Sequence, residues 1–466
     1  MTDKYNIILF LTDDHAQWAV GAYNNPVINT PNLDYLANSG ALMENAYSPT
    51  PVCSPGRACL LTGRMASQHG LHDYLSSGVD DAIDSHEWLR GEMLLPDLLK
   101  KSGYKTYLSG KWHLGHEAKP KADFDHTFTM GDEYPFTHDG KRSFFEDGNP
   151  VEEVGYKTQI FTEKAIDYLR QHDHDHPFFL QVGYIGTHNP WEGHPERLVN
   201  QYRNQALTDN TNKSSYPFGI QNLESTLHYR NNPHESLAQY YGAVSHIDEK
   251  VGQILDAVDS LELKENTLII YTSDHGLNCG HHGIWGKGNG TLPLNMVEES
   301  VRVPLILNHP GNILPNQHCF EFVDHTDLFQ TILAYAGVEL DQSFIQERNY
   351  PGRSFASQLT HELPLKEWRK HQICEYGDVR MIRNQQWKLI RRYPNGPNEL
   401  IDLIKDPNEE VNLFLQVENQ EIIQQLTTIL DRHFTQYADE TNNGLNVKKL
   451  PLQNHTEAWR DPRNLH

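Results

Sequence analysis

The feature that most constrains the fold is a series of short apolar runs, each separated from the next by segments with helical periodicity. Five runs rich in Ile, Leu, Phe, Tyr and Val predict strands at residues 6–12, 104–108, 178–184, 267–273 and 303–307. They show little polar alternation, which is typical of strands covered on both faces. Helices are expected at residues 32–39, 94–102, 158–171, 236–261 and 326–336. This pattern predicts an α/β fold in which a large mixed, mostly parallel sheet is flanked by helices.

A change of pattern after about residue 360 predicts a second, smaller domain. Short strands are expected at residues 372–376, 387–391 and 399–402, with an amphipathic helix at residues 420–437. We therefore expect a larger domain over residues 1–360 and a smaller α+β domain, with an antiparallel sheet and a helix, over residues 361–466. The polar, Asn-rich residues 192–235 are expected to form a looped insert. The residues after the last helix show no clear pattern and are expected to wrap over the surface or fray.

The charge balance limits the partners of the chain. The 466 residues include 39 Lys and Arg against 62 Asp and Glu, a net charge of −23. Binders of nucleic acid and of anionic membranes rely on basic surfaces, so neither partner is expected. The 5 cysteines form no C-x-x-C pair, which does not favour a disulfide framework or a structural zinc site. Without a signal-peptide core the chain as given is expected to be cytoplasmic, or periplasmic or secreted if a leader was removed.

Polar and charged side chains directly follow four of the expected strands. The residues that share this position are Asp13, Asp14, Lys111, His113, His188, Asp274 and His275. Ligands bind outside the carboxyl ends of strands in open α/β sheets, so these side chains are expected at one edge. Three carboxylates there would repel one another unless a cation lay between them, and oxygen-rich sites suit Ca²⁺ or Mg²⁺. An ordinary strand-terminal turn is the simpler interpretation of either Asp pair alone, but two such pairs favour a metal site.

A cysteine stands where a helix is expected to begin, in the segment C-S-P-G-R at residues 53–57. Ser54 is a good N-cap, and Pro55 suits the first helical turn. Cys53 would then lie at a helix N-terminus, where free N–H groups and the helix dipole favour an anion. Arg57, one turn further on, could face the same anion. The alternative is a buried, inert thiol, which is the commonest fate of a single cysteine.

Two longer motifs go beyond these local signals. They are C-x-P-x-R at residues 53–57, followed by T-G-R at 62–64, and G-K-W-H-L-G at residues 110–115. Together they resemble the type I, formylglycine-dependent sulfatase family of the alkaline phosphatase superfamily. The segments D-D at 13–14, T-P-N-L-D at 30–34, S-D-H-G at 273–276, R-V-P at 302–304 and the stretch from residue 400 to 413 are also similar. The resemblance covers nearly the whole chain and implies an alkaline-phosphatase-like catalytic domain with sulfuric ester hydrolase activity.

The resemblance also implies two cofactors. Cys53 would be oxidised by a formylglycine-generating enzyme to Cα-formylglycine, whose hydrate attacks sulfur while Asp13 or Asp274 takes the proton. One metal ion, usually Ca²⁺ in this family, would be held by Asp13, Asp14, Asp274, His275 and the modified residue 53. The fourth motif position, often Ser in the family, is Gly56 here.

Roles for the remaining site residues follow from the same resemblance. Arg57, Lys111 and Lys287 would stabilise the charge on the sulfuryl oxygens. His188 would protonate the leaving alcohol as general acid, and His113 would be the base that releases the sulfate. Lys287 lies in a glycine-rich segment, so a merely solvated lysine is the alternative for that residue.

The substrate and two rival functions stay open at this point. A sulfated small molecule or glycan is expected, with a sulfated sugar preferred because aromatic and polar loop residues suit a carbohydrate ring; Trp18, Trp191 and Arg380 are the candidates for contacting it. One rival is a phosphonate or phosphate monoester hydrolase of the same superfamily. The other is a catalytically inactive, Ca²⁺-binding glycan-recognition protein, which the intact catalytic motifs disfavour. His281 and His282 could line the pocket or simply end a turn.

Overall fold

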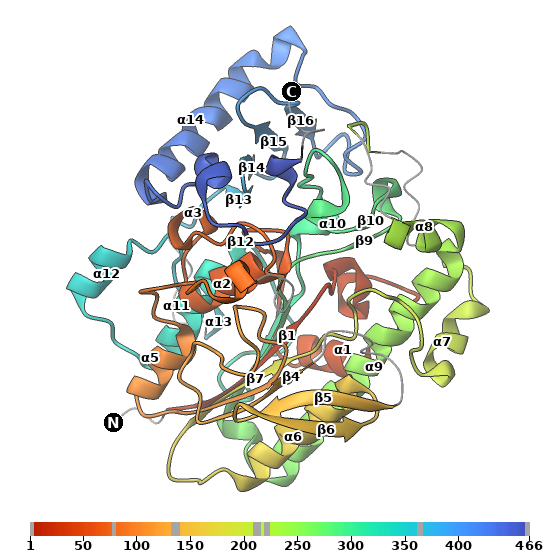
Figure 1. Cartoon of the computed structure of the whole chain (residues 1–466), viewed down its shortest axis with the longest axis vertical. Coiled ribbons are helices and arrows are strands. Elements are labelled where there is room, and N and C mark those ends of the chain that lie inside the picture. Colours follow the sequence, from red (N-terminus) through yellow and green to blue (C-terminus); the bar gives the residue numbers. More distant parts are fainter. Residues whose placement is uncertain are drawn as a thin grey trace.

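The computed structural model describes residues 4–76, 81–131, 140–207, 216–218, 224–360 and 367–461. A ten-stranded mixed sheet forms the centre of the molecule, with helices on both faces, and a four-stranded antiparallel sheet with a long helix lies at one end (Figure 1). The predicted fold class, an α/β domain joined to a smaller C-terminal domain, is confirmed. A domain boundary at residue 360 stays a prediction.

The large sheet has the strand order β12-β2-β11-β8-β1-β7-β3-β4-β5-β6. Its strands are β1 (Asn6–Thr12), β2 (Ala41–Tyr47), β3 (Lys105–Gly110), β4 (His126–Met130), β5 (Lys141–Glu146), β6 (Asn149–Val154), β7 (Phe178–Gly183), β8 (Thr267–Ser273), β11 (Leu305–Asn308) and β12 (Gln317–Asp324). β1 pairs in parallel with β7 and β8, and β3 pairs in parallel with β7. The carboxyl ends of these four strands therefore meet at one edge.

The five strands expected from apolar runs are all present, while five others were not expected. β1 and β8 match the expected bounds, whereas β2, β4, β5, β6 and β12 were missed. β5 and β6 form an antiparallel extension at one end of the sheet, and most of their side chains are at least partly exposed. A strand that faces water lacks the continuous apolar run by which the central strands were found.

Alternate residues of β1 enter two separate cores, which is why its sequence is apolar throughout. Ile7, Leu9 and Leu11 belong to one cluster, and Ile8 and Phe10 to the other. The helices of the first face are α2 (Cys53–Thr62), α5 (Leu95–Lys101) and α11 (His325–Tyr335), and those of the second are α1 (Pro31–Asn38), α6 (Lys157–Gln171) and α9 (Pro233–Ser260). All of these β1 side chains are fully buried, so the strand is fixed between two helical layers.

The Asn-rich segment is not the loop that was expected. It contains α7 (Glu196–Arg203) and α8 (Glu224–Asn231), while residues 208–215 and 219–223 lie outside the described residues. Leu198, Val199 and Tyr202 of α7 are buried. The exposed face of the helix is polar, so the segment as a whole is polar in composition although its apolar positions have helical spacing. The expectation of a loop followed the composition and was wrong.

The other short elements of the first 360 residues are connections around the sheet. They are α3 (Ala66–His69), α4 (Asp81–Asp84), β9 (Asn278–Cys279), β10 (Trp285–Gly286), α10 (Glu298–Val301), α12 (Gln342–Arg348) and α13 (Ala356–Leu359). No helix in the described residues has both the length and the apolarity that crossing a membrane requires.

The smaller sheet is an antiparallel meander of β13 (Gln372–Tyr376), β14 (Val379–Arg383), β15 (Trp387–Arg392) and β16 (Glu399–Asp402). β14 was missed because its sequence, V-R-M-I-R, has no uninterrupted apolar run. The helix α14 (Gln420–Tyr437) has the predicted bounds and packs Leu426, Leu430 and Phe434 against this sheet. This blue part of the chain lies beside α2, α3 and β12 of the larger domain (Figure 1).

The C-terminal segment wraps back onto the larger domain, one of the two outcomes expected for it. The Gln453 side chain accepts hydrogen bonds from the backbone N–H groups of His72 and Asp73, at 2.8 and 2.6 Å. Trp459 is buried and packs edge-on against Tyr376. The tail therefore holds the small domain next to the loop that follows α3.

Candidate active site

The carboxyl edge of the large sheet gathers the charged side chains that the sequence placed after its strands. Asp13 and Asp14 follow β1, Asp274 and His275 follow β8, and Cys53 is the first residue of α2. The side chains brought together here, all buried except the partly buried His113, are Asp13, Asp14, Cys53, Arg57, Lys111, His113, His188, Asp274, His275 and Lys287. We call this set the catalytic cluster.

Cys53 lies at the centre of the cluster. Its Sγ is 2.9 Å from Nζ of Lys287 and 3.3 Å from Nε2 of His275. Burial raises the pKa of the thiol, but the ammonium groups of Lys287 and Lys111 outweigh it and hold the pKa well below its ordinary value. A side chain at this position is therefore surrounded by groups that favour negative charge, and the interpretation of Cys53 as an inert core thiol is not supported.

Four residues offer ligand atoms that lie close enough to share one ion. One ligand atom each of Asp13, Asp14, Cys53 and His275 lies within 4.8 Å of the others. Nε2 of His275 is 3.0 Å from Oδ1 of Asp14 and 4.0 Å from Oδ1 of Asp13. The fourth predicted carboxylate, Asp274, has its Oδ1 3.4 Å from the same Nε2.

The hydrogen bonding of these residues fits a divalent cation. Oδ1 of Asp13 is buried and has no hydrogen-bond partner among the described residues. Nδ1 of His275 is 2.8 Å from the carbonyl oxygen of Gly276, which favours donation from Nδ1 and leaves the Nε2 lone pair facing the carboxylates. An orphaned carboxylate oxygen and an oriented imidazole nitrogen are what a bound metal would satisfy.

Arg57 connects two of the strand ends. Its Nε donates to Oδ2 of Asp274 at 2.9 Å, and its Nη1 donates to the carbonyl oxygen of Lys111 at 3.1 Å. Burial and the neighbouring Asp13 carboxylate raise the pKa of Asp274 to about 7. The guanidinium group is thus a fixed, fully buried positive charge one turn along α2 from Cys53.

Two lysines complete the positive side of the cluster. Nζ of Lys111 is 2.5 Å from Oδ2 of Asp13, and Nζ of Lys287 is 2.6 Å from Oδ1 of Asp14. Burial lowers the pKa of Lys287, but the carboxylate of Asp14 outweighs it, so the pKa is well above its ordinary value. Lys287 is therefore a buried, charged member of the site, and the alternative of a solvated loop lysine is wrong.

The two predicted proton-transfer histidines take different positions. Nε2 of His188 is 4.0 Å from Oδ2 of Asp14, while its Nδ1 is 2.7 Å from the carbonyl oxygen of Asn189. Burial lowers the pKa of His188, but Asp14 outweighs it and the pKa lies above its ordinary value, which suits a proton donor. Burial and the Lys111 ammonium lower the pKa of His113, which suits a base.

Glu117, which the sequence reasoning missed, positions a residue of the catalytic cluster. Its carboxylate accepts the backbone N–H of His113 at 2.8 Å and that of Trp112 at 3.2 Å. His113 has a positive φ of 57°, an uncommon conformation for a residue with a Cβ, and the carboxylate holds it there. Burial raises the pKa of Glu117 to about 7. Its place four residues after His113 was the available signal.

The glycine in the cysteine motif is required by close packing. A Cβ on Gly56 would lie 2.3 Å from the carbonyl oxygen of Asp274 and 3.1 Å from Oγ of Ser48. Oγ of Ser48 itself donates to that carbonyl oxygen at 2.6 Å. The motif helix therefore approaches the carboxyl end of β8 so closely that a larger residue at position 56 would force the two apart.

The three residues expected to contact substrate lie in packed surroundings. Trp191 is 3% exposed, packs against Tyr229, Tyr240 and Trp285, and donates from Nε1 to the carbonyl oxygen of Thr187 at 2.9 Å. This packing holds the loop that carries His188, so a structural role accounts for Trp191 without a ligand.

Arg380 and Trp18 are likewise engaged with protein groups. Arg380 is 4% exposed, lies 3.6 Å from the ring centre of Phe434 and donates to Oδ1 of Asn443. Trp18 is half-buried, packs against His281 at 4.6 Å and lines a hollow of about 310 Å³ that includes no residue of the catalytic cluster. Contact of any of these three residues with a substrate stays a prediction.

His282 belongs to a second group of ligand-type side chains. Its Nε2 is 3.0 Å from Oε2 of Glu299, and a ligand atom of Glu409 from the small domain lies within 4.8 Å of both. Lys388, which is fully buried, pairs with Glu409 at 2.7 Å. We call His282, Glu299, Glu409 and Lys388 the joint cluster, because it links the two domains.

The fold and the catalytic cluster define a class of enzyme, the hydrolases of esters of tetrahedral oxyanions. Fixed cations and a metal-type ligand set around one nucleophile position suit such esters, because charge develops on several oxygens during their cleavage. Within this class the chain belongs to the sulfatase family: the family profile named Sulfatase matches residues 5–338. A second profile, N-sulphoglucosamine sulphohydrolase, C-terminal, matches residues 280–436. The chain is therefore a sulfuric ester hydrolase by family.

Curated relatives share the sequence over most of its length. An N-acetylglucosamine-6-O-sulfatase from Bacteroides thetaiotaomicron is 28% identical over 513 residues, covering 94% of this chain and 88% of that protein. The human N-acetylgalactosamine-6-sulfatase is 31% identical over 359 residues, covering 72% of this chain and 62% of that protein.

Solved structures share the fold. A protein solved in complex with its substrate D-glucosamine-2-N,6-O-disulfate has a TM-score of 0.79 and 26% identity, covering 94% of this chain and 99% of that chain. The phosphonate monoester hydrolase of Agrobacterium radiobacter has a TM-score of 0.74 at 18% identity, covering 94% of this chain and 97% of that chain. The fold is thus shared between enzymes of different ester chemistry, so fold alone does not select the substrate.

Proposed function

We propose that this sulfatase hydrolyses the sulfate ester of a sulfated carbohydrate, with a Cα-formylglycine derived from Cys53 and one Ca²⁺ held by Asp13, Asp14, Asp274 and His275. The observation that carries the proposal is the position of Cys53, within 3.3 Å of both Lys287 and His275 at the edge where the carboxylates meet. The names of the relatives, which act on sulfated amino sugars, support the carbohydrate. Formylglycine formation requires a formylglycine-generating enzyme as a partner.

The cofactors and the chain divide the chemistry between them. When bound, Ca²⁺ offsets negative charge near the substrate, and the hydrated aldehyde supplies the nucleophilic hydroxyl. Arg57, Lys111 and Lys287 place three positive charges around position 53 and stabilise the charge that develops on the sulfuryl oxygens. Because all three are buried and anchored to carboxylates or backbone, they need no rearrangement as that charge develops.

Two histidines handle the protons. His188, whose pKa the Asp14 carboxylate raises above its ordinary value in spite of burial, gives its proton to the leaving alcohol. His113, with its lowered pKa, is the base that accepts a proton when sulfate is released. The net reaction consumes one water, breaks the sulfur–oxygen bond and yields an alcohol, a sulfate ion and a proton.

A second candidate function has one observation in its favour. The phosphonate monoester hydrolase from Agrobacterium radiobacter shares the fold, so a phosphonate or phosphate monoester is the rival substrate. A purely sugar-binding protein without turnover is the other alternative. In such a protein Arg57, Lys111 and Lys287 would serve no evident purpose. Three buried positive charges around an unused thiol would only cost desolvation free energy.

The test is production of the chain together with a formylglycine-generating enzyme, followed by mass spectrometry of the peptide that carries residue 53. We expect the aldehyde in this peptide and turnover of defined sulfated monosaccharides that exceeds turnover of the matching phosphates. Cys53→Ala should abolish turnover. Cys59→Ala is the matched control, since Cys59 is buried in the same helix and its sulfur contacts His69, which lies outside the catalytic cluster. An unmodified thiol in an enzyme that still turns over, or phosphate esters as better substrates, would contradict the proposal.

A further inference from the structure

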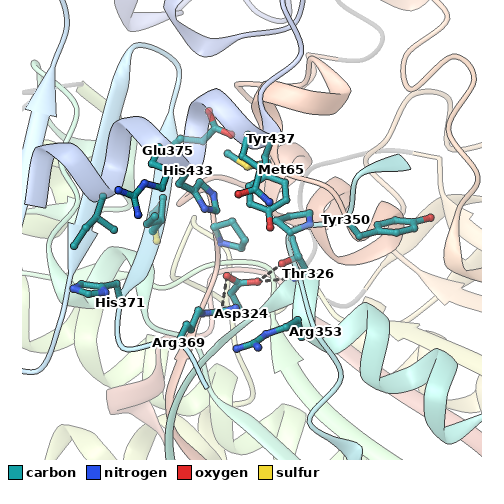
Figure 2. Close-up of a pocket in the computed structure, with 17 residues that line it drawn as sticks. Met65, Asp324, Thr326, Tyr350, Arg353, Arg369, His371, Glu375, His433 and Tyr437 are labelled. Atoms are coloured by element: carbon teal, nitrogen blue, oxygen red, sulfur yellow. Dashed lines mark hydrogen bonds and ion pairs between the residues drawn. The ribbon is translucent and has the colours of Figure 1, made fainter. Parts of the chain in front are cut away.

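A second cavity, of about 560 Å³, lies between the two domains and includes no residue of the catalytic cluster. Its walls come from β13 and α14 of the small domain and from the start of α11 and residues 350–353 of the larger domain. Figure 2 shows side chains from both domains around this space, with Asp324 and Arg369 in its lower part and the Tyr350 side chain at one side, directed away from it. We call it the interdomain cavity.

The two carboxylates that line the interdomain cavity are already satisfied by protein groups. Asp324 accepts hydrogen bonds from Thr326, from Nε2 of Gln372 at 2.9 Å and from Nη2 of Arg369 at 3.0 Å. Glu375 accepts from the backbone N–H of Ser67 at 2.7 Å and from its hydroxyl at 2.5 Å. Neither carboxylate therefore presents an unpaired charge that would repel an anion.

Two arginines at the rim are free to bind an anion. The Arg432 side chain makes no hydrogen bond or ion pair within the part of the chain that the structure describes. Arg353 lies 4.7 Å from the ring centre of Trp368, and its one hydrogen bond, to the carbonyl oxygen of Glu367, is 3.3 Å long. Stacked or free guanidinium groups keep most of their N–H donors available, and they bind sulfate and carboxylate groups in a fork geometry.

The remaining polar groups of the cavity are neutral donors on flat rings. Burial and the Arg369 guanidinium lower the pKa of His433 to about 4, and burial and Lys370 lower the pKa of His371, so both imidazoles are neutral near pH 7. No hydrogen bond of either imidazole, or of the Tyr437 hydroxyl, occurs among the described residues. Aromatic rings beside unused hydroxyl and N–H groups suit the faces and hydroxyls of a sugar.

We propose that the interdomain cavity binds a sugar unit that carries a sulfate or carboxylate group. A volume of about 560 Å³ is in the range of small-molecule sites and is larger than a bare sulfate ion requires. The proposal does not depend on the chemistry of Cys53, since the two sites share no residue.

The cavity wall is connected to the segment that carries the nucleophile. The backbone N–H of Glu375 donates to the carbonyl oxygen of Pro49 at 2.8 Å, and Sγ of Cys374 is 3.4 Å from the carbonyl oxygen of Ser48. Cys53 is four positions after Pro49, so their Cα atoms are at most roughly 14 Å apart. The sugar in the cavity could thus be a distal unit of a substrate chain or a separate acidic sugar, two sources that share one binding chemistry.

Binding is tested on the Cys53→Ala protein, which cannot be modified to the aldehyde. The probes for calorimetry are D-glucosamine 6-sulfate, D-glucuronate, uncharged N-acetyl-D-glucosamine and inorganic sulfate. We expect the two acidic sugars to bind at least tenfold more tightly than the uncharged sugar and than sulfate alone. In the Arg353→Ala, Arg432→Ala double variant this binding should weaken at least tenfold, because two charge-assisted contacts are lost.

A control variant and a second readout separate the cavity from the active site. Arg170→Ala removes an exposed arginine of α6 and should leave binding unchanged. When the same double substitution is made in enzyme that keeps Cys53 and has it converted to formylglycine, kcat/KM for an aryl sulfate should stay within twofold. Acidic-sugar binding that is the same in the double variant and the parent, or that is matched by N-acetyl-D-glucosamine, would overturn the proposal.

The two sources give different kinetics. A distal unit predicts that the double variant raises KM for a sulfated tetrasaccharide about fivefold or more and leaves KM for the sulfated monosaccharide unchanged. If the cavity binds a separate sugar, the double variant should leave both KM values unchanged. The double substitution should still remove acidic-sugar binding when it is made in the Cys53→Ala protein. If the modified enzyme cleaves no sulfate ester at all, the proposed function fails, while the binding measurement still decides the cavity.

Discussion

The catalytic cluster and the joint cluster are built from the same types of side chain, yet they serve different purposes. Each places carboxylate and imidazole ligand atoms within 4.8 Å of one another. In the joint cluster Oε1 of Glu409 also lacks a hydrogen-bond partner among the described residues, but Nζ of Lys388 lies 2.7 Å from it and 3.1 Å from Oε1 of Glu298, so a protein cation neutralises it. In the catalytic cluster Oδ1 of Asp13 has no partner among the described residues although Lys111 and Lys287 are close. A buried carboxylate oxygen with neither a hydrogen-bond partner nor a lysine paired to it, more than the number of acidic residues, distinguishes a site that suits a metal ion.

The largest expected effect comes from removing that oxygen. Asp13→Asn should lower kcat by at least a thousandfold, about 4 kcal/mol of transition-state stabilisation, because the substitution removes a carboxylate from the metal ligand set and the partner of Lys111. The readout is turnover of an aryl sulfate by fully modified enzyme, with bound Ca²⁺ measured in parallel. Glu299→Gln, in the joint cluster, should keep kcat within tenfold. Equal losses in the two variants would remove the distinction between the clusters.

Breaking the joint cluster should affect stability before catalysis. Lys388→Met leaves Glu409 buried without its cation and removes one of the cations that pair with Glu298, so it should lower the free energy of unfolding by about 3 kcal/mol. Urea unfolding measures this loss. Lys405→Ala is the control, since that lysine is 81% exposed and its pair with Asp402 should contribute well under 1 kcal/mol. A loss below 1 kcal/mol for Lys388→Met would mean that the joint cluster does not hold the domains together.

The joint cluster also gives stability a defined pH window. The hydrogen bond from His282 outweighs burial and lowers the pKa of Glu299 to about 2, so this contribution is present above pH 4.5 and is lost as pH falls toward 2. Glu299 in turn outweighs burial and raises the pKa of His282, so that contribution is present below about pH 6.5 and is lost as pH rises through the raised value. Two further groups act on His282: the Glu409 carboxylate also raises its pKa, and the Lys388 ammonium group lowers it.

The contribution of this pair to stability should therefore be largest between about pH 4.5 and 6.5, at about 2 kcal/mol. His282→Gln should flatten the decline above pH 6.5, and Glu299→Gln should flatten the decline below pH 4.5. Unchanged pH profiles in both variants would show that the pair is not coupled to folding.

The smallest effect is expected from changing the close backbone contact between α2 and the residue after β8. Gly56→Ala places a Cβ 2.3 Å from the carbonyl oxygen of Asp274, so α2 must shift and the free energy of unfolding should fall by about 1–2 kcal/mol. Activity should fall about tenfold, since Cys53 moves relative to Asp274. Gly103→Ala is a useful contrast, because nothing lies within 4 Å of its Cβ position and only its positive φ of 91° is strained. A Gly56→Ala enzyme of normal activity would show that the close approach is not needed.

Sequence reasoning was most successful where function depends on residues next to a strand end. Asp13, Asp14, Asp274 and His275 were found because β1 and β8 are unbroken apolar runs whose last residues are easily recognised. It could not show what surrounds a residue whose neighbours come from elsewhere in the chain. The Trp191 ring packs against residues of α8, α9 and β10, and its contact with substrate stays a prediction.

The sequence by itself determined the family, the central strands and the residues of the catalytic cluster, including the proposed nucleophile position Cys53, because motifs and strand ends are local and a hydrogen-bonded sheet fixes where consecutive residues lie. Only the tertiary structure decided that Lys287 touches Cys53 across 234 positions, that Gly56 must lack a side chain, and that a cavity with free arginines opens between the domains. The physical reason is that burial, pKa and unpaired polar groups depend on neighbours in space. These neighbours come from segments far apart in the chain, and folding alone brings them together.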